Sequence, residues 1–191
     1  MIETEIRTDA ELIELSRMDP EMFGLLMERY RGPLFHYIRR IGRFADEDTE
    51  DLLQEVFIKV YRKLNEYTEA LKFSSWAYRI AHNHVIDHFR KLNARPKVDM
   101  LDDVEWGRLI AGSVDIEKEL MNADCVEKIK TVIRDLPIRY KEVLILRFIE
   151  EKEYEEIMDI LQKPKGSVAT LIARGRKILL KRMEEEHVDC H

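Results

Sequence analysis

The segment Tyr154-Glu-Glu-Ile-Met-Asp-Ile-Leu-Gln-Lys-Pro-Lys-Gly-Ser-Val-Ala-Thr-Leu171 decides the fold of the C-terminal part of the chain. It opens with a short helical pattern, and Gln162 to Gly166 separate that pattern from a longer one. This connection is long enough to reverse the chain and too short to form another element. The segment therefore predicts two consecutive helices joined by a tight turn, the layout of a helix-turn-helix.

The second of these helices has two chemically different faces. At about 100° per residue, one face is apolar and the other carries Thr170, Arg174, Lys177 and Lys181. Seven cations and no acid occur from Lys163 to Arg182, although the formal net charge of the chain is -6. Such segregation is typical of nucleic-acid binding, and a solvent-exposed basic hairpin is the alternative.

The whole chain has the composition of a helical globular protein. Of its 191 residues, 45% are apolar and 37% are charged, with only seven Gly and five Pro, and no strand-like alternation competes with the helical spacing. We therefore expect an all-α protein. Helices are predicted at Asp9–Arg17, Pro20–Ile41, Asp46–Leu64, Ser75–Asn93, Glu117–Arg134, Ile138–Glu150, Tyr154–Leu161 and Pro164–Glu186.

Residues 94–120 interrupt this pattern. They lack helical periodicity and carry more acids than bases, which favours an acidic linker between two helical domains over a long surface loop within one. The expected boundaries are 1–96 for the first domain, 97–120 for the linker, 121–186 for the second domain and 187–191 for a tail.

Two helices of the predicted first domain have surfaces that core packing alone does not explain. Near Asp51, apolar residues fill one arc, but Ile58 falls among the polar residues, as in surfaces that bind partner proteins; a lone exposed Ile is also ordinary. In the helix that follows Phe73, Trp76 and Ile80 lie beside cations, a combination that can stack unpaired bases, while core packing is the alternative.

Two groups of histidines could bind metal, but neither supplies a convincing ligand set. His84 and His88 are one turn apart beside Asp87, yet no third ligand is evident, so structural or phosphate-facing, partly exposed histidines are expected, His82 included. In the tail, His187, Cys190 and His191 could bind metal or sense oxidation, but a frayed terminus is expected instead. We expect no metal and no cofactor.

Three motifs in order resemble the extracytoplasmic-function (ECF) group of the sigma-70 family of bacterial RNA polymerase sigma factors. Asp51-Leu-Leu-Gln-Glu-Val-Phe-Ile-Lys59 is similar to the core-binding motif of region 2, and Phe73 to Arg90 is similar to the promoter-melting helix. Leu136-Pro137, Tyr154 to Ile157 and Gly166 onward resemble region 4. The resemblance implies a region 2 helical bundle and a region 4 helix-turn-helix, and a non-enzymatic initiation factor that directs core polymerase to promoters.

The resemblance also implies the functional residues. Core polymerase would bind Asp51, Gln54, Glu55 and Ile58 through the coiled-coil of its largest subunit, and its flap is a further expected contact. The loop from Asn65 to Lys72 and Asn83 would receive a flipped base of the minus-10 element. The expected minus-10 residues are Asn65, Tyr67, Lys72, Trp76, Arg79, Asn83 and Arg90, and the expected minus-35 residues are Lys163, Lys165, Ser167, Thr170, Arg174 and Lys177.

One departure concerns minus-35 recognition. Where the family commonly has Gly-Thr-Val-Lys-Ser-Arg, this chain has Gly166-Ser-Val-Ala-Thr-Leu171, so Ala169 and Leu171 replace two cations. Either Thr170, Lys165 and Arg174 read the element with more recognition of DNA shape, or binding there is weaker and region 2 supplies more of the specificity.

The remaining expectations concern location and the competing functions. No apolar stretch is long enough to span a bilayer, no signal-peptide layout is present, and two cysteines do not form a disulfide framework, so a cytoplasmic protein without membrane insertion is expected. Its expected partners are core polymerase, promoter DNA and an anti-sigma factor. A stand-alone helix-turn-helix regulator is the alternative, and a metal hydrolase built on His84, Asp87 and His88 is disfavoured because no nucleophile or complete ligand set is present.

Overall fold

The structure is a computed structural model that describes residues 7–92, 129 and 131–185. Every regular element in these residues is helical, as the sequence predicts. The chain divides into two compact units, one N-terminal and one C-terminal. Four expectations fall outside the described residues: the linker at 97–120, most of the helix at 117–134, the tail at 187–191 and the environment of both cysteines.

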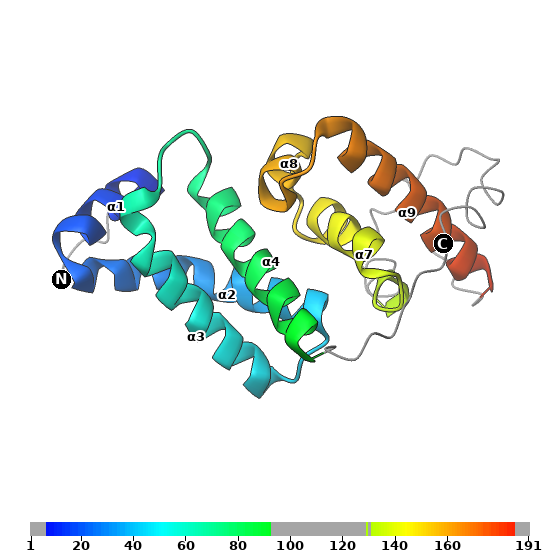
Figure 1. Ribbon diagram of the computed structural model, residues 1–191, viewed down its shortest axis with the longest axis horizontal. Helices are drawn as coiled ribbons and strands as arrows, with labels where there is room; N and C mark the ends of the chain where they lie inside the picture. The colour runs from blue at the N-terminus through cyan, green and yellow to red at the C-terminus, as the bar shows by residue number, and fades with distance from the viewer. Residues whose placement is uncertain (1–6, 93–128, 130, 186–191) are drawn as a thin grey trace. The chain divides into compact units, whose positions relative to one another are not determined.

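The N-terminal unit is a bundle of four α-helices with two short 3₁₀ turns. Its elements are α1 (Asp9–Met18), η1 (Pro20–Met22), α2 (Phe23–Gly42), α3 (Asp46–Arg62), η2 (Leu64–Glu66) and α4 (Phe73–Leu92). Figure 1 shows α3 and α4 running in opposite directions, joined by an extended loop that follows η2. The expected helices at 9–17, 20–41, 46–64 and 75–93 are therefore present, with ends that differ by a few residues.

Local sequence signals explain where these helices begin and end. Thr8 and Glu11 form a reciprocal capping box at the start of α1. Asp19 accepts a hydrogen bond from the Glu21 backbone N–H at 3.0 Å, with Pro20 in the first position of η1. At the end of α2, Arg43 adopts a left-handed conformation with φ of 56°.

The core of this unit forms around α2. Leu34, Tyr37, Ile38 and Ile41 are fully buried, and burial of each aliphatic side chain stabilises the fold by about 1.5–3 kcal/mol. Tyr37 meets Tyr78 of α4 with ring centroids 4.9 Å apart. On the same side of α4, Tyr78, Ala81 and Val85 are buried, and Phe89 stacks on Phe44.

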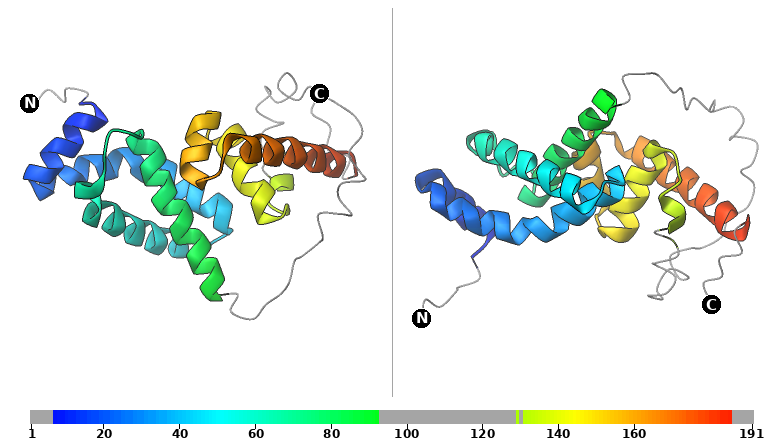
Figure 2. Two further views of the ribbon diagram at one scale, coloured as in Figure 1. Left: turned by 45° about the horizontal axis from the view of Figure 1, so that its top comes forward. Right: turned by 90° about the horizontal axis from the view of Figure 1, so that it is seen from below.

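The C-terminal part of the chain contains α7 (Ile138–Leu144), the π-helical turn η3 (Ile145–Ile149), α8 (Tyr154–Leu161) and α9 (Lys165–Glu185). The predicted helix at 138–150 therefore changes from α to π geometry partway. Figure 2 shows α9 running alongside α7 in both views. The two helices approach closely at Gly175, where a Cβ atom would lie 3.2 Å from the Leu144 side chain.

Among the described residues, no helix is both long and apolar enough to span a bilayer.

Candidate functional site

The exposed face of α3 carries all four residues predicted to bind a partner protein. Asp51, Gln54, Glu55 and Ile58 are exposed, and Ile58 retains 50% of its accessible surface. The opposite face is buried and consists of Leu52, Leu53, Val56, Phe57 and Val60. Because packing accounts for the buried face only, Ile58 is an apolar side chain left among polar neighbours, as the sequence predicted.

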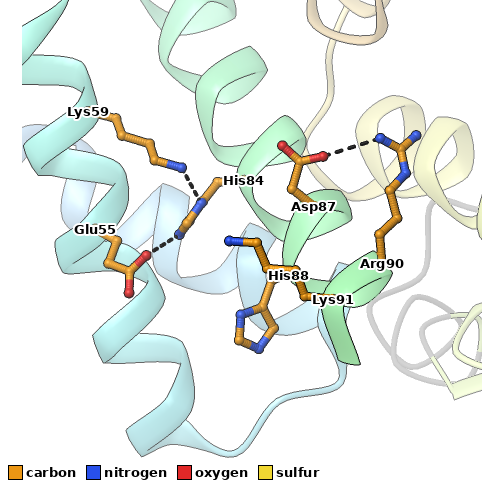
Figure 3. Close-up of a pocket in the computed structure, with 7 residues that line it drawn as sticks. All are labelled: Glu55, Lys59, His84, Asp87, His88, Arg90 and Lys91. Carbon is orange, nitrogen blue, oxygen red and sulfur yellow. Dashed lines mark hydrogen bonds and ion pairs between the residues drawn. The ribbon is translucent and has the colours of Figure 1, made fainter. Parts of the chain in front are cut away.

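Glu55 is attached to α4 through a buried histidine (Figure 3). His84 lies with Nε2 2.9 Å from Glu55 Oε2 and Nδ1 2.5 Å from Lys59 Nζ. A lysine ammonium can only donate, so Nδ1 is the acceptor and Nε2 carries the proton that faces Glu55. The three residues form a continuous chain from Lys59 to the exposed carboxylate of Glu55.

The electrostatic environment keeps His84 in this neutral form. Burial, and next the charge of Lys59, lower the pKa of His84 below its ordinary value, while Glu55 acts in the opposite direction. A neutral imidazole can accept from Lys59, which a protonated ring cannot do. Its Nε2 then lies against the Glu55 carboxylate at 2.9 Å without a hydrogen bond of good geometry. The arrangement therefore places a buried imidazole beside one carboxylate of the predicted partner-binding face.

An open pocket of about 370 Å³ lies beside this chain. Figure 3 shows its lining, which comes from α3 and α4 and comprises Glu55, Lys59, His84, Asp87, His88, Arg90 and Lys91. Arg90 pairs with Asp87 at 3.2 Å, and both side chains are exposed, so the pair contributes little to stability. Positive and negative groups alternate around the pocket, and they do not form a single-sign site.

The expectation of partly exposed histidines is wrong for two of the three. His82 and His84 are each 7% exposed, and His82 Nδ1 lies 3.1 Å from the Tyr37 hydroxyl. Buried polar rings require partners, which Tyr37 supplies for His82 and Lys59 supplies for Nδ1 of His84. Within the residues that the structure describes, no three His, Cys, Asp or Glu side chains converge into a metal site.

The loop between α3 and α4 is held at its first turn by an arginine from α1. Arg17 Nη2 donates to the Leu64 carbonyl at 3.2 Å and to the Tyr67 carbonyl at 2.8 Å. Tyr67 is 8% exposed, and its hydroxyl donates to the Leu71 carbonyl at 2.7 Å. Tyr67, predicted to contact DNA, thus has its ring inside the unit, where it shapes the loop.

The other residues predicted for minus-10 DNA divide between the loop and one face of α4. Asn65 and Lys72 are exposed on the loop. Trp76, Arg79, Asn83 and Arg90 recur at helical spacing on one face, where Asn83 and Arg90 are exposed and the other two are partly exposed. Since α4 rises about 1.5 Å per residue, Arg90 lies roughly 20 Å along the helix from Trp76. The structure brings Trp76 into contact with Tyr67 and Phe73, whereas Arg90 lies at the pocket.

The exposed face of α9 carries the residues predicted to read minus-35 DNA. Lys165, Ser167, Thr170 and Arg174 are exposed, and Lys163 and Lys177 are partly exposed. The Thr170 hydroxyl donates to the Gly166 carbonyl at 2.7 Å, which orients its oxygen. The opposite face of α9 is buried through Val168, Ile172, Gly175, Ile178, Leu179 and Met183.

Acids from other helices approach the first cations of this face. Lys163 Nζ lies 3.5 Å from Glu142 of α7, and Lys165 Nζ lies 3.5 Å from Glu155 of α8. Glu142 is 5% exposed, and burial raises its pKa more strongly than Lys163 lowers it. The acid-free run of sequence therefore does not correspond to an acid-free surface at the start of α9.

Arg147 connects the π-helical turn to the start of α8. Its guanidinium donates to the Lys152 carbonyl at 3.2 Å, lies 3.4 Å from the Glu153 carboxylate and stacks over the Tyr154 ring at 5.5 Å. Glu153 caps α8 in a capping box with Glu156. The position of the first helix of the predicted helix-turn-helix is thus fixed by side chains that precede it.

Sequence reasoning did not identify Arg17, the buried Glu142 or the link from Lys59 through His84 to Glu55. Each depends on a contact between helices that are distant in the sequence. For Glu142, the only signal available was its place directly before the apolar stretch from Val143 to Leu146.

Comparisons with known proteins match both units. The sigma-70 region 2 family matches residues 26–95, and the sigma-70 region 4 family matches residues 127–179. The chain is 30% identical over 190 residues to the ECF RNA polymerase sigma factor SigW of Bacillus subtilis, covering 95% of this chain and 99% of SigW. It is also 30% identical to the ECF RNA polymerase sigma-E factor of Haemophilus influenzae, covering 90% and 93%.

Solved structures share the fold at lower identity. CnrH, in complex with the cytosolic domain of CnrY, matches with a TM-score of 0.66 and 18% identity over 93% of this chain and 97% of CnrH. The sigma factor RpoE, in complex with the anti-sigma factor NepR from Bartonella quintana, matches with a TM-score of 0.63 and 18% identity over 87% and 98%. Together with the two family matches and the relatives that extend over almost the whole chain, they lead to one conclusion: this protein belongs to the ECF group of RNA polymerase sigma factors.

Proposed function

We propose that this chain binds core RNA polymerase through α3, directs it to promoters with two sequence elements, and starts melting at the minus-10 element. The observation that supports this proposal best is the half-exposed Ile58 among Asp51, Gln54 and Glu55. A sigma factor is a transcription initiation factor and not an enzyme. We therefore reject the hypothesis of a metal hydrolase built on His84, Asp87 and His88.

The proposed polymerase contact combines apolar and charged groups. Ile58 would insert into an apolar site on the coiled-coil of the largest subunit, while the neighbouring carboxylates would meet its cations. The flap of the core is the proposed partner of the C-terminal unit.

The proposed minus-10 contact uses the exposed part of the α3–α4 loop with Asn83, while Trp76, Arg79 and Arg90 support the melted strand. Extruding a base from the duplex costs a few kcal/mol. A receptor that binds only the extruded base offsets this cost at a matching sequence, so recognition and melting are coupled.

The proposed minus-35 contact places α9 in the major groove. Arg174 and Lys177 would contact the DNA backbone or bases from the exposed face, and Ser167 and Thr170 would approach base edges near the start of the helix. With Ala169 and Leu171 in place of cations, we propose that DNA shape contributes more to recognition of this element.

The proposed setting is the cytoplasm, where polymerase and chromosome are available, with an anti-sigma factor as regulator. The complex of RpoE with the anti-sigma factor NepR from Bartonella quintana motivates the latter part of the proposal.

The proposed function is tested with the full chain, core polymerase and linear DNA templates whose upstream region is randomised. Sequencing of the transcripts should reveal start sites that share two short upstream elements. Absence of any enrichment over core polymerase alone would overturn the proposal. Tight site-specific binding without polymerase, together with no redirected transcription, would instead favour the stand-alone regulator.

A further inference from the structure

We infer that Arg17 of α1 is a positioning residue for the loop that reads the minus-10 element. The inference rests on the proposed function, because it assigns to Arg17 an effect on base selection by the α3–α4 loop. Arg17 lies before residues 26–95, the part of the chain that matches region 2, and was not among the residues expected to act on DNA.

The Arg17 guanidinium contacts backbone carbonyls of the loop. Nη2 donates to the carbonyls of Leu64 and Tyr67 at 3.2 and 2.8 Å, so one side chain closes both ends of the 3₁₀ turn η2. Glu14, one turn earlier on α1, holds the other end of the fork at 2.5 Å from Nη1. The Arg17 side chain is 28% exposed, which weakens competition from water.

Tyr67 transmits this restraint to the exposed part of the loop. Its carbonyl is held by Arg17, and its hydroxyl donates to the Leu71 carbonyl at 2.7 Å. Its ring packs against Phe73 and Trp76 at centroid distances of 5.5 and 5.2 Å. The exposed residues 68–70 therefore lie between two fixed points of the backbone.

Fixing these points matters because the loop has no regular secondary structure between η2 and α4. A flexible receptor loses conformational entropy when it orders around a base, and it can adapt to more than one base. A loop held from α1 starts closer to its binding conformation. Loss of Arg17 should therefore reduce discrimination between bases while leaving the α3 surface intact.

Two substitutions separate geometry from charge. Arg17→Met keeps much of the apolar stem and removes every donor. Arg17→Lys keeps the charge, but a single ammonium lacks the planar fork that holds Glu14 and two carbonyls together. Since Lys retains the positive charge, a loss shared by both variants cannot come from a missing attraction for phosphate.

Arg29→Met is the matched control. Arg29 also secures the N-terminal segment, donating to Asp9 Oδ1 at 2.5 Å and to the Arg7 carbonyl at 2.6 Å. Neither of these hydrogen bonds reaches a carbonyl of the α3–α4 loop. Arg29→Met therefore tests whether any weakened attachment of α1 has the same effect.

The experiment uses the full chain with core polymerase and the randomised template pool. We expect Arg17→Met and Arg17→Lys to reduce the enrichment of the preferred bases within the minus-10 element about fivefold to tenfold, as for loss of one or two hydrogen bonds. Enrichment within the minus-35 element and affinity for core should not change. Arg29→Met should select bases as the unaltered chain does.

Amide hydrogen exchange of the free full chain provides a readout that needs no DNA. Exchange at residues 65–72 should quicken in the Arg17 variants and not in Arg29→Met. Unchanged base selection in Arg17→Lys and Arg17→Met would overturn the inference, as would an equal loss in all three variants. If the unaltered chain selects no template, the proposed function fails and this inference fails with it.

Discussion

Helices α3 and α9 are both amphipathic, yet their exposed faces are constructed differently. On α3, the acids at positions 51 and 55 remain exposed, and the notable member of the face is the apolar Ile58. At the start of α9, the first two cations of the basic run meet acids supplied by α7 and α8: Lys163 in the preceding turn and Lys165 on the helix. The exposed face of α3 thus has the charge that its sequence indicates. The positive charge at the start of α9 is partly neutralised by acids from neighbouring helices.

The difference between α3 and α9 shows when the charge of a surface can be predicted from sequence. Neighbours on one helix are set by periodicity, so the members of the α3 face follow from spacing alone. Neighbours across helices depend on tertiary packing, which a run of Lys and Arg does not reveal. The centre of the basic face should accordingly bind DNA more strongly than its start, whereas α3 should depend on one apolar contact.

The largest expected effect is the loss of polymerase binding in Ile58→Glu. Placing a carboxylate in an apolar contact should weaken binding to core by about 100-fold or more, as at interface hot spots. The free energy of unfolding should change by less than about 0.5 kcal/mol, because Ile58 is half exposed. Affinity for core and urea denaturation measure the two quantities.

Leu25→Glu is the control for this substitution. Leu25 is 41% exposed on α2, outside the proposed contact. Equal loss of binding in both variants would contradict the assignment of the contact to α3, and unfolding of Ile58→Glu would show that Ile58 is a core residue.

A smaller effect is expected for the basic face. Arg174→Ala should weaken binding of the polymerase complex to promoter DNA about threefold to tenfold, and lower the slope of log affinity against log salt by about one. Lys163→Ala should change the slope less, because moving Lys163 to DNA would leave Glu142 buried without this partner. Titrations of DNA binding against salt compare the change in slope in the two variants. A greater change in Lys163→Ala than in Arg174→Ala would contradict the prediction.

His84 should make the stability of the N-terminal unit depend on pH. Its pKa is lowered in the folded chain by burial and Lys59, with a smaller contribution from His88 and opposition from Glu55. The unfolded chain therefore binds a proton first as the pH falls through about 6.5, and the free energy of unfolding should fall by at most about 1.4 kcal/mol per pH unit.

His84→Gln keeps one acceptor and one donor for Lys59 and Glu55 but does not titrate. Urea denaturation between about pH 5 and about pH 8 should show a weaker pH dependence in this variant than in the unaltered chain. An unchanged dependence would show that other groups determine it.

The smallest expected effect concerns Glu142. Burial raises the pKa of this carboxyl, so the folded chain holds the proton to higher pH than the unfolded chain. Its contribution to stability is complete below the ordinary glutamate pKa of 4.5 and declines as the pH rises through the folded pKa. In Glu142→Gln this decline should be absent from denaturation curves, and a decline equal to that of the unaltered chain would contradict the prediction.

The sequence was sufficient to predict most of the helices. Asp19 and Pro20 mark a helix start by local chemistry, and apolar periodicity indicated the buried faces of α3, α4 and α9. It did not predict the change from α to π geometry at Ile145, because the residues there are ordinary helix formers.

The candidate site was predictable only in part. The exposure of Ile58 and Arg174 followed from periodicity, and the family resemblance led to the loop after α3. The burial of Tyr67 and His84 did not, since it depends on packing between α3, α4 and the segments around them. Local spacing indicates which side chains share a helix face, but it does not show which faces a neighbouring helix will cover.

The π-helical turn has a consequence for how the C-terminal unit can vary. The Glu150 amide donates to the Ile145 carbonyl at 2.9 Å, five residues back, so this stretch holds one residue more than an α-helical turn would. The additional residue determines the direction in which the chain continues after α7. It also determines where Arg147 lies relative to the Tyr154 ring. An insertion or deletion within Ile145–Ile149 should therefore be tolerated far less than a substitution. This short stretch acts as a spacer that determines the orientation of the helix-turn-helix.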